Sequence, residues 1–244
     1  MRTMTRNNRL LAILPAYNEC GKIGRVVEKV TKESIVDEVM VADDCSTDGT
    51  AEEARNAGAV VICHNTNRGV GAGIRTGIMY GIKNDFEICT ILSGDDQHEP
   101  TEIERVVKPI IDGEYDFIQG SRRMAGGKVV NDKTFRMIFT QLYSLFFSIL
   151  TGARITDATN GFRAFRTSIF DEHEIDLDQS WLDRYELEPY ILYKAVKDKN
   201  IRLKEVPITI YYHRKAKEYT KMKPIRDWWR IAKPVVYLAL KLRK

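Results

Sequence analysis

The segment LLAILPAYNE, residues 10–19, contains the pattern that decides the fold. Its first seven residues, Leu10 to Ala16, carry no polar side chain. Such a run predicts a strand that is buried on both faces, because a strand with one wet face alternates apolar and polar residues. The polar residues YNE follow directly at 17–19. A buried strand that ends in a polar cluster is the unit that recurs along the chain.

Apolar runs and helical segments alternate over the next eighty or so residues. Three further buried strands are predicted at the apolar runs 38–42, 59–63 and 88–92. Helical spacing of apolar residues, capping residues and a glycine-rich start predict helices at 21–31, 51–57 and 69–80. This alternation predicts an α/β fold, with a mostly parallel sheet covered by helices on both faces.

Polar clusters follow the predicted strands that end at Ala16, Ala42 and Leu92. Ligands of such sheets bind beyond the carboxyl ends of the strands, so the three clusters are expected to converge on one rim. In the last cluster, LSGDDQHEP, Asp95 and Gln97 lie two residues apart and project to the same side of an extended chain. Two oxygen donors on one side suit Mg²⁺ or Mn²⁺. The competing interpretation is that an aspartate of this cluster caps a helix that begins near Pro100.

Composition and cysteine usage limit the class of protein. The chain has 244 residues, 43% hydrophobic and 30% charged, which suits a soluble protein with one large α/β domain or two small ones. The four cysteines are Cys20, Cys45, Cys63 and Cys89, and they show no disulfide or metal-ligand spacing. No signal peptide is visible at the N-terminus. We therefore expect reduced thiols and a cytoplasmic location.

Basic charge is concentrated near the C-terminus. Residues 202–244 carry a net charge of +10, whereas the rest of the chain carries −6. A basic tail on an acidic body predicts a polyanionic partner or an anionic surface. Nucleic acid is a poor candidate, because the tail contains no base-reading module.

Five short motifs occur in a recognisable order. They are PAYNE at 15–19, ADDCSTDGT at 42–50, SGDDQHEP at 93–100, GSR at 120–122 and NGFRAF at 160–165. Together they resemble the family 2 inverting glycosyltransferases, and most closely the dolichyl- or polyprenyl-phosphate sugar synthases. The resemblance extends over roughly residues 10–221. It implies a GT-A, Rossmann-like fold, a nucleotide-sugar donor and a divalent cation, Mg²⁺ or Mn²⁺.

The resemblance also implies which residues bind the donor. The implied positions are Pro15, Tyr17, Glu19, Asp43, Gly94, Asp95 and Gln97. Asp95 and Gln97 would hold the cation. The chain departs from the family motif at Ser93, where the family has an aspartate, and a hydroxyl is a weaker ligand for a hard cation. Either the metal site is shifted by one residue, so that Asp96 contributes, or metal affinity is reduced.

Cationic residues are implied on both sides of the reaction. Arg214 and Lys221 match positions that close over the donor diphosphate, with a solvated basic loop as the alternative. Arg122 and Arg136 match positions that bind the acceptor phosphate, a task suited to the planar fork of arginine.

Asp157 matches the position usually called catalytic, and Asp95 is the second residue expected to be essential for transfer. With a phosphate acceptor, Asp157 would orient groups, because the acceptor is already an anion. With a hydroxyl acceptor, it would act as a general base. A helix cap is the structural alternative for Asp157. Glu186 matches a family acidic position, and a surface helix carboxylate explains it almost as well.

Two segments are candidates for contact with a membrane. The uncharged stretch 137–153 predicts an interfacial helix, with a core helix or a true span as alternatives. Residues 222–244 are interpreted as a basic amphipathic helix that follows a glycosyltransferase domain of residues 1–221. Pro234 is expected to kink or interrupt this helix. The competing interpretation packs it on the domain, with its basic side in water.

The resulting hypothesis is a peripheral enzyme on the cytoplasmic membrane face. It would move a hexose from a GDP- or UDP-sugar to a polyprenyl or dolichyl phosphate, with inversion. The alternatives are a relative that glycosylates a hydroxyl of a lipid or polysaccharide, and a nucleotide-binding module with weak or no activity.

Overall fold

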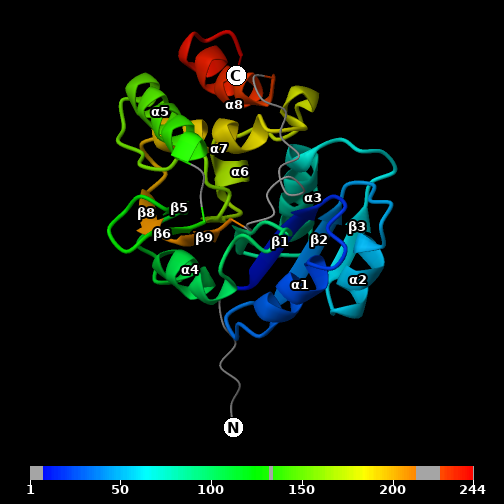
Figure 1. The fold of residues 1–244 in the computed structure, drawn as a ribbon. Coiled ribbons are helices and arrows are strands. Elements are labelled where there is room, and N and C mark those ends of the chain that lie inside the picture. The colour runs from blue at the N-terminus through cyan, green and yellow to red at the C-terminus, as the bar shows by residue number, and fades with distance from the viewer. Residues whose placement is uncertain (1–7, 132–133, 213–225, 244) are drawn as a thin grey trace.

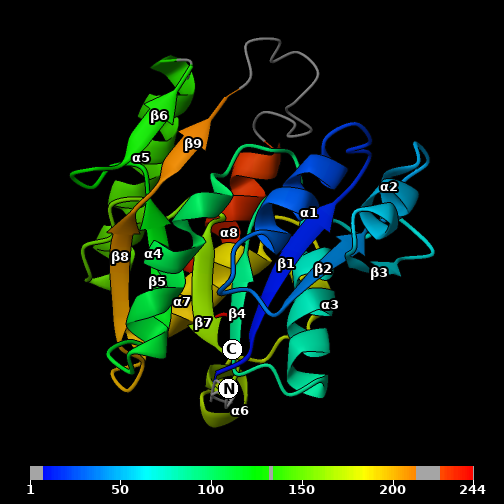
Figure 2. The ribbon, with the colours of Figure 1, turned by 90° about the horizontal axis from the view of Figure 1, so that it is seen from below.

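A computed structural model of the chain describes residues 8–131, 134–212 and 226–243, without the side chains of 134–136. Its centre is a seven-stranded sheet in the order β3-β2-β1-β4-β7-β5-β8 (Figures 1 and 2). The strands are β1 (Leu10–Ala16), β2 (Glu38–Asp43), β3 (Val60–Cys63), β4 (Ile88–Ile91), β5 (Phe117–Ser121), β7 (Arg163–Arg166) and β8 (Leu203–Pro207). Strand β7 runs antiparallel to β4 and β5, and the other neighbours pair in parallel. The predicted mostly parallel sheet is therefore confirmed.

Helices cover both faces of this sheet (Figure 2). They are α1 (Ile23–Thr31), α2 (Thr50–Asn56), α3 (Val70–Lys83), α4 (Ile103–Ile111), α5 (Thr134–Thr151), α6 (Ile169–Glu172), α7 (Leu187–Lys197) and α8 (Arg226–Ala239), with 3₁₀ turns at Pro100–Glu102 and Ser180–Leu182. Short strands β6 (Lys128–Val130) and β9 (Thr209–Tyr211) form a second, parallel pair. The elements predicted between residues 10 and 92 are all present, with ends within three residues of the prediction.

Strand β1 is apolar throughout because both of its faces are buried. Leu11 and Ile13 belong to a core shared with α3, α5, α7 and α8, whereas Leu10 and Leu14 belong to a second core shared with α1 and α4. Helix α3 comes especially close to the strand, since a β-carbon at Gly77 would collide with the Ile13 side chain. The glycine-rich sequence of α3 thus permits close helix–strand packing.

Helix α8 is packed on the domain through its apolar face. Val235 and Leu238 are buried in the core with α5 and α7, and the Tyr143 hydroxyl donates a 2.9 Å hydrogen bond to the Ile231 carbonyl. This arrangement is the competing interpretation of the C-terminal sequence, and it corrects the expectation that this apolar face lies in a membrane. Pro234 lies inside the helix and does not interrupt it.

Helix α5 exposes apolar side chains instead. Its exposed apolar residues are Met137, Ile138, Phe139, Leu142, Leu145 and Ile149. Among the described residues, no helix combines the length and hydropathy that a membrane span requires.

Candidate active site

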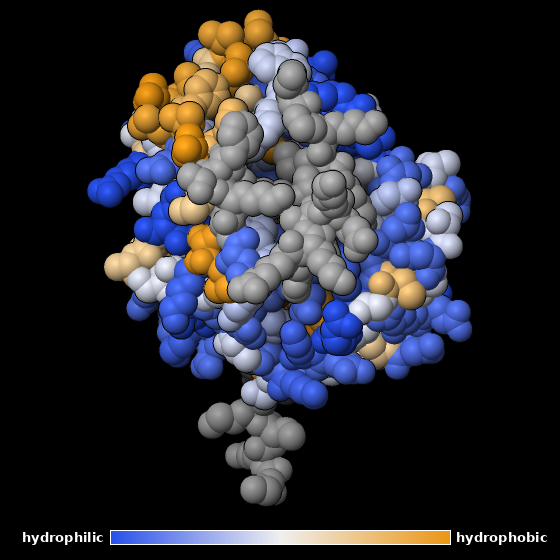
Figure 3. Space-filling model, viewed as in Figure 1, coloured by the Kyte–Doolittle hydropathy of each residue, from blue (hydrophilic) through white to orange (hydrophobic). Residues whose placement is uncertain are grey.

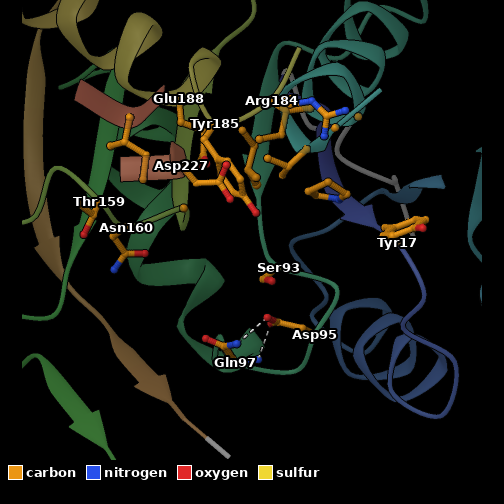
Figure 4. Close-up of a pocket in the computed structure, with 18 of the residues that line it drawn as sticks. Tyr17, Ser93, Asp95, Gln97, Thr159, Asn160, Arg184, Tyr185, Glu188 and Asp227 are labelled. Carbon is orange, nitrogen blue, oxygen red and sulfur yellow. Dashed lines mark hydrogen bonds between the residues drawn. The ribbon is translucent and has the colours of Figure 1, made fainter. Parts of the chain in front are cut away.

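A cavity of about 700 Å³ opens at the carboxyl ends of β1, β2 and β4. Residues from several predicted motifs line it, including Pro15, Tyr17, Glu19, Asp95 and Gln97. Figure 4 shows Asp95 and Gln97 on one side of this space and Glu188, Tyr185 and Asp227 on another. The polar clusters therefore converge as the strand pattern predicts.

The loop after β4 presents Asp95 to the cavity. Gln97 donates from its side chain to Asp95 Oδ2 at 2.6 Å and from its backbone to Oδ1 at 3.2 Å. Burial raises the pKa of Asp95, the charge of Glu19 raises it further, and a hydrogen bond with Ser93 opposes both. The surroundings of Asp95 thus disfavour its charged form. A bound cation would stabilise that charged form.

The donor set suits a cation that is shared with a ligand. The described residues contain no group of three or more His, Cys, Asp or Glu side chains that would hold a metal unaided. Asp95, the Gln97 amide and the Ser93 hydroxyl are oxygen donors of the kind that Mg²⁺ accepts alongside phosphate oxygens and water. These residues therefore fit a divalent cation that would neutralise charge on a bound diphosphate.

Asp96 and Gly94 have positions that differ from those of the donor residues. Asp96 adopts a positive φ of 63° and forms a 2.9 Å ion pair with Lys29 of α1, which argues against the proposed metal role of Asp96. Gly94 is buried, and a β-carbon there would lie 3.1 Å from the carbonyl oxygen of Pro15. The glycine lets the loop pack under the cavity, and Gly94 is not among the residues that line it.

His98 stabilises the loop after β4. Its Nδ1 accepts a 2.9 Å hydrogen bond from the Ser93 backbone, and its ring lies 5.2 Å from that of Phe162. Burial, followed by the positive charge of Arg122, lowers the pKa of His98 to about 3. The imidazole is therefore neutral, as its acceptor role requires.

The two aspartates at the end of β2, Asp43 and Asp44, have different surroundings. Asp43 is buried; its Oδ2 accepts from the Ser46 backbone at 3.2 Å, and its Oδ1 has no hydrogen-bond partner among the described residues. Asp44 lines the cavity and accepts from the backbone of Gly69 at 2.7 Å, just before α3. It also bonds His64 at 2.8 Å. The family resemblance implied nucleotide contact for Asp43 and gave no sign of these contacts of Asp44.

Arg122 and Asp157 form a buried ion pair beside the cavity. Arg122 Nε and Nη2 each lie 2.6 Å from a different oxygen of Asp157, whose side chain is 0% exposed. The same guanidinium donates to the hydroxyls of Thr159 and Tyr212, each at 2.7 Å. Arg122 lines the cavity, and Asp157 lies behind it. The arginine, 7% exposed, is thus held by three partners at the edge of the cavity.

The charge state of Asp157 follows from this pairing. Burial alone would raise the pKa of Asp157, but the charge of Arg122 and its hydrogen bonds outweigh burial and hold the pKa below its usual range. A carboxylate that is buried, paired and weakly basic is poorly suited to remove a proton. Both oxygens of Asp157 are thus occupied by Arg122.

Two polar side chains on neighbouring strands, the partly buried Glu205 and the buried Gln119, bind the backbone of the loop 156–160. Glu205 of β8 accepts from the backbone N–H groups of Thr156 and Asp157 at 2.8 and 3.0 Å. Gln119 of β5 donates to the carbonyl oxygens of Asp157 and Asn160 at 3.0 and 2.9 Å. Neither residue stood out in the sequence, because single polar residues in strands carry no recognisable motif.

The structure corrects the reading of the segment WLDRYELEP. Glu186 is 5% exposed and lies 3.8 Å from Arg230 and 3.9 Å from Lys233, so it anchors α8 and is no surface carboxylate. Burial raises the pKa of Glu186, while the charges of those two cations oppose the rise. Glu188, two residues later, lines the cavity instead.

The structure does not describe the side chains of three basic residues that the sequence predicted at the site. Arg214 and Lys221 lie outside the described residues, and Arg136 is described by its backbone in α5 without its side chain. Their roles stay predictions.

Comparison with known proteins agrees with this geometry. The sequence model of "Glycosyl transferase family 2" matches residues 11–174. The chain is 30% identical to an undecaprenyl-phosphate mannosyltransferase of Micrococcus luteus, over 82% of this chain and 83% of that protein. It is 29% identical to a polyprenol monophosphomannose synthase of Mycolicibacterium smegmatis, over 85% and 79%.

Among solved structures, a similar fold is that of Mycobacterium tuberculosis glucosyl-3-phosphoglycerate synthase in complex with Mn²⁺, UDP and phosphoglyceric acid. The TM-score is 0.71 at 17% identity, covering 96% of this chain and 78% of that one. At this identity the similarity shows the fold, which is the predicted GT-A arrangement.

Proposed function

The chain belongs to glycosyltransferase family 2, and on that basis we propose that it transfers a hexose from a nucleoside diphosphate sugar to a polyprenyl phosphate, with inversion. The acceptor class follows the two relatives named above, which are polyprenyl-phosphate mannose enzymes by name. The cavity supports the proposal at both ends of the reaction.

The donor end is the rim formed by β1, β2 and β4. A divalent cation held by Asp95 and Gln97 together with the donor diphosphate would neutralise charge that develops on the leaving group. The unpartnered Oδ1 of Asp43 would suit an N–H donor such as that of a nucleobase, but Asp43 is 2% exposed and is not among the residues that line the cavity. Tyr17 and Glu19 line the space between, where the base and ribose are expected.

The acceptor end is centred on Arg122. Its ion pair with Asp157 is the observation that carries the proposal. A hydroxyl acceptor needs a base, whereas a phosphate acceptor is already an anion and needs cationic groups that hold it in line with the anomeric carbon. Asp157 is buried and paired with Arg122. It would therefore orient the Arg122 guanidinium and would not act as a general base. The observed geometry favours the phosphate over the hydroxyl alternative.

A membrane-bound acceptor would reach this site from the side of α5. Figure 3 shows a hydrophobic patch over the position of α5, where the helix exposes Leu142, Leu145 and Ile149. Exposed apolar patches mark interaction surfaces, and this one lies near Thr140, which lines the cavity. We propose that α5 makes the peripheral membrane contact.

Steady-state kinetics of Arg122→Lys test the acceptor assignment. Lysine keeps a positive charge beside Asp157 but loses the planar fork. The acceptor KM should rise by about tenfold, as expected when one charge-assisted hydrogen bond is lost, while the donor KM stays unchanged. An unchanged acceptor KM would remove Arg122 from the acceptor site.

A further inference from the structure

The wall of the cavity that faces the Asp95 loop contains two carboxylates, Glu188 and Asp227, that are not among the residues to which the family resemblance assigned a role. Glu188 lies in the first turn of α7 and Asp227 in the first turn of α8, and both lie outside the matched segment 11–174. We propose that Glu188 and Asp227 bind hydroxyl groups of the donor sugar and restrict the donor to neutral hexoses, an inference that rests on the function proposed above.

Glu188 is held in place before any ligand binds. Its Oε1 lies 3.2 Å from Nη2 of Arg163, which is 1% exposed. The same guanidinium donates to the backbone carbonyls of Glu188 at 3.0 Å and Asn160 at 2.5 Å. One buried arginine thus hydrogen-bonds the backbone of Glu188 and forms an ion pair with its carboxylate, whose Oε1 accepts no hydrogen bond among the described residues. The Glu188 side chain remains 22% exposed, on the cavity side shown in Figure 4.

Asp227 brings a second carboxylate from a different element. It is 1% exposed, and its Oδ1 lies 3.3 Å from Arg226 Nε and 3.4 Å from Arg230 Nη1. Tyr185 is labelled beside both acids in Figure 4. Burial and the charge of Asp227 raise the pKa of its hydroxyl, the charges of Arg184 and Arg230 oppose the rise, and Glu188 adds a smaller increase. The three side chains therefore form one polar group on the wall of the cavity (Figure 4).

The chemistry of this group selects a neutral polyol. Ionised carboxylates accept hydrogen bonds and donate none, and each offers about four acceptor positions. Sugar hydroxyls donate to such oxygens in charge-assisted bonds, and two adjacent hydroxyls match the two oxygens of one carboxylate. Arg163, Arg226 and Arg230 balance the charge of the two acids, so selection rests on hydrogen bonding: an ionised phosphate or hexuronate carboxylate has no hydrogen to donate to these oxygens, whereas a hydroxyl has one. The two phosphates of the reaction are thus directed to the Asp95 loop and to Arg122.

Titration calorimetry on the full chain with Mn²⁺ tests this assignment. The probes are UDP, GDP, UDP-glucose, GDP-mannose and UDP-glucuronate. The variants are Glu188→Gln and Asp227→Asn, which keep the shape of the side chains. Glu172→Gln, at an exposed carboxylate of α6, is the matched control.

The wild type should bind a neutral nucleotide hexose more tightly than the free nucleoside diphosphate. In each variant, the ratio of the nucleotide-hexose affinity to the free-nucleotide affinity should fall by about tenfold, the effect of one charge-assisted hydrogen bond. The Kd of the free nucleotide should stay unchanged. UDP-glucuronate should bind more weakly than UDP-glucose, and Glu188→Gln should narrow the difference. The proposal is overturned if both variants keep the full affinity difference between nucleotide hexose and free nucleotide. It is also overturned if the affinity for the free nucleotide falls in parallel.

Transfer to polyprenyl phosphate, measured in parallel, separates this inference from the proposed function. If the binding pattern appears without transfer to that acceptor, the proposed acceptor is wrong and the sugar site stands. If transfer occurs while the variants keep the full gain, the sugar site is wrong and the proposed function stands. If no probe binds, both fail.

Discussion

Arg122 and Asp157 face each other as a bidentate pair, with Nε and Nη2 of the guanidinium each 2.6 Å from a separate carboxylate oxygen. The pair is almost completely buried, with side-chain exposures of 7% and 0%. Removing one partner leaves the other as an uncompensated charge, whereas removing both does not. Stability and acceptor binding are therefore linked at this pair and must be separated experimentally.

Asp157→Ala should lower the free energy of unfolding by about 3–5 kcal/mol, the usual cost of breaking a buried pair from one side. The double variant Arg122→Met with Asp157→Leu should recover most of that loss and still fail to transfer sugar. Urea denaturation of both proteins measures this. A single variant that costs less than about 1 kcal/mol would mean that the pair is solvated, as exposed pairs are.

The pairing also predicts a pH dependence of stability. The pKa of Asp157 is lower in the folded protein than its usual value, so the stabilisation is present above the unfolded pKa and is lost as pH falls through the folded pKa. The advantage of the wild type over Asp157→Asn should stay constant near neutrality and shrink below about pH 4, the usual aspartate range. Unfolding free energies across that range give the answer, and an advantage that grows on acidification would contradict the assigned charge state.

Ser93→Asp tests the metal site. It supplies a second carboxylate beside Asp95, and hard cations bind carboxylates more strongly than hydroxyls. Calorimetry should show Mn²⁺ binding to the wild type chiefly in the presence of a nucleoside diphosphate, and to Ser93→Asp without it. As a control, Asp96→Asn should leave Mn²⁺ affinity unchanged, because Asp96 pairs with Lys29. Equal nucleotide dependence in wild type and Ser93→Asp would exclude this loop as the cation site.

The exposed face of α5 predicts how the protein reaches a membrane. Leu145→Asp and Ile149→Asp, at side chains 57% and 70% exposed, should reduce sedimentation with anionic vesicles without destabilising the fold. Met79→Asp, at an exposed apolar residue of α3, is the matched control and should leave binding unchanged. Equal loss in all three variants would point to a general charge effect, and no loss in any of them would remove α5 from the interface.

Sequence predicted the first half of the fold well for a physical reason. Strands such as β1 are buried on both faces, so their apolar runs are unmistakable, and the polar residues after them mark the rim of the site. The motif after β4 located Asp95 and Gln97 correctly on the cavity. It did not show that the neighbouring Asp96 turns to α1, which depends on a positive φ and a distant lysine.

The second half of the chain was harder to predict because its determinants are tertiary. The basic and apolar stripes of α8 are typical of a membrane-surface helix, but the apolar stripe meets α5 and α7, and Arg230 and Lys233 lie near the buried Glu186. Glu188 and Asp227 occur in unremarkable charged segments. Only the fold brings them to one cavity, together with strand-end residues more than seventy positions earlier in the chain.

The choice of acceptor is the most direct test of the account. Purified protein with Mn²⁺ and a labelled donor should be given a polyprenyl phosphate and the matched polyprenol under identical detergent conditions. We predict transfer to the phosphate, with an alkali-stable, acid-labile product, and none to the alcohol. Transfer to the alcohol with none to the phosphate would contradict the central claim that Arg122, oriented by Asp157, receives an anionic acceptor.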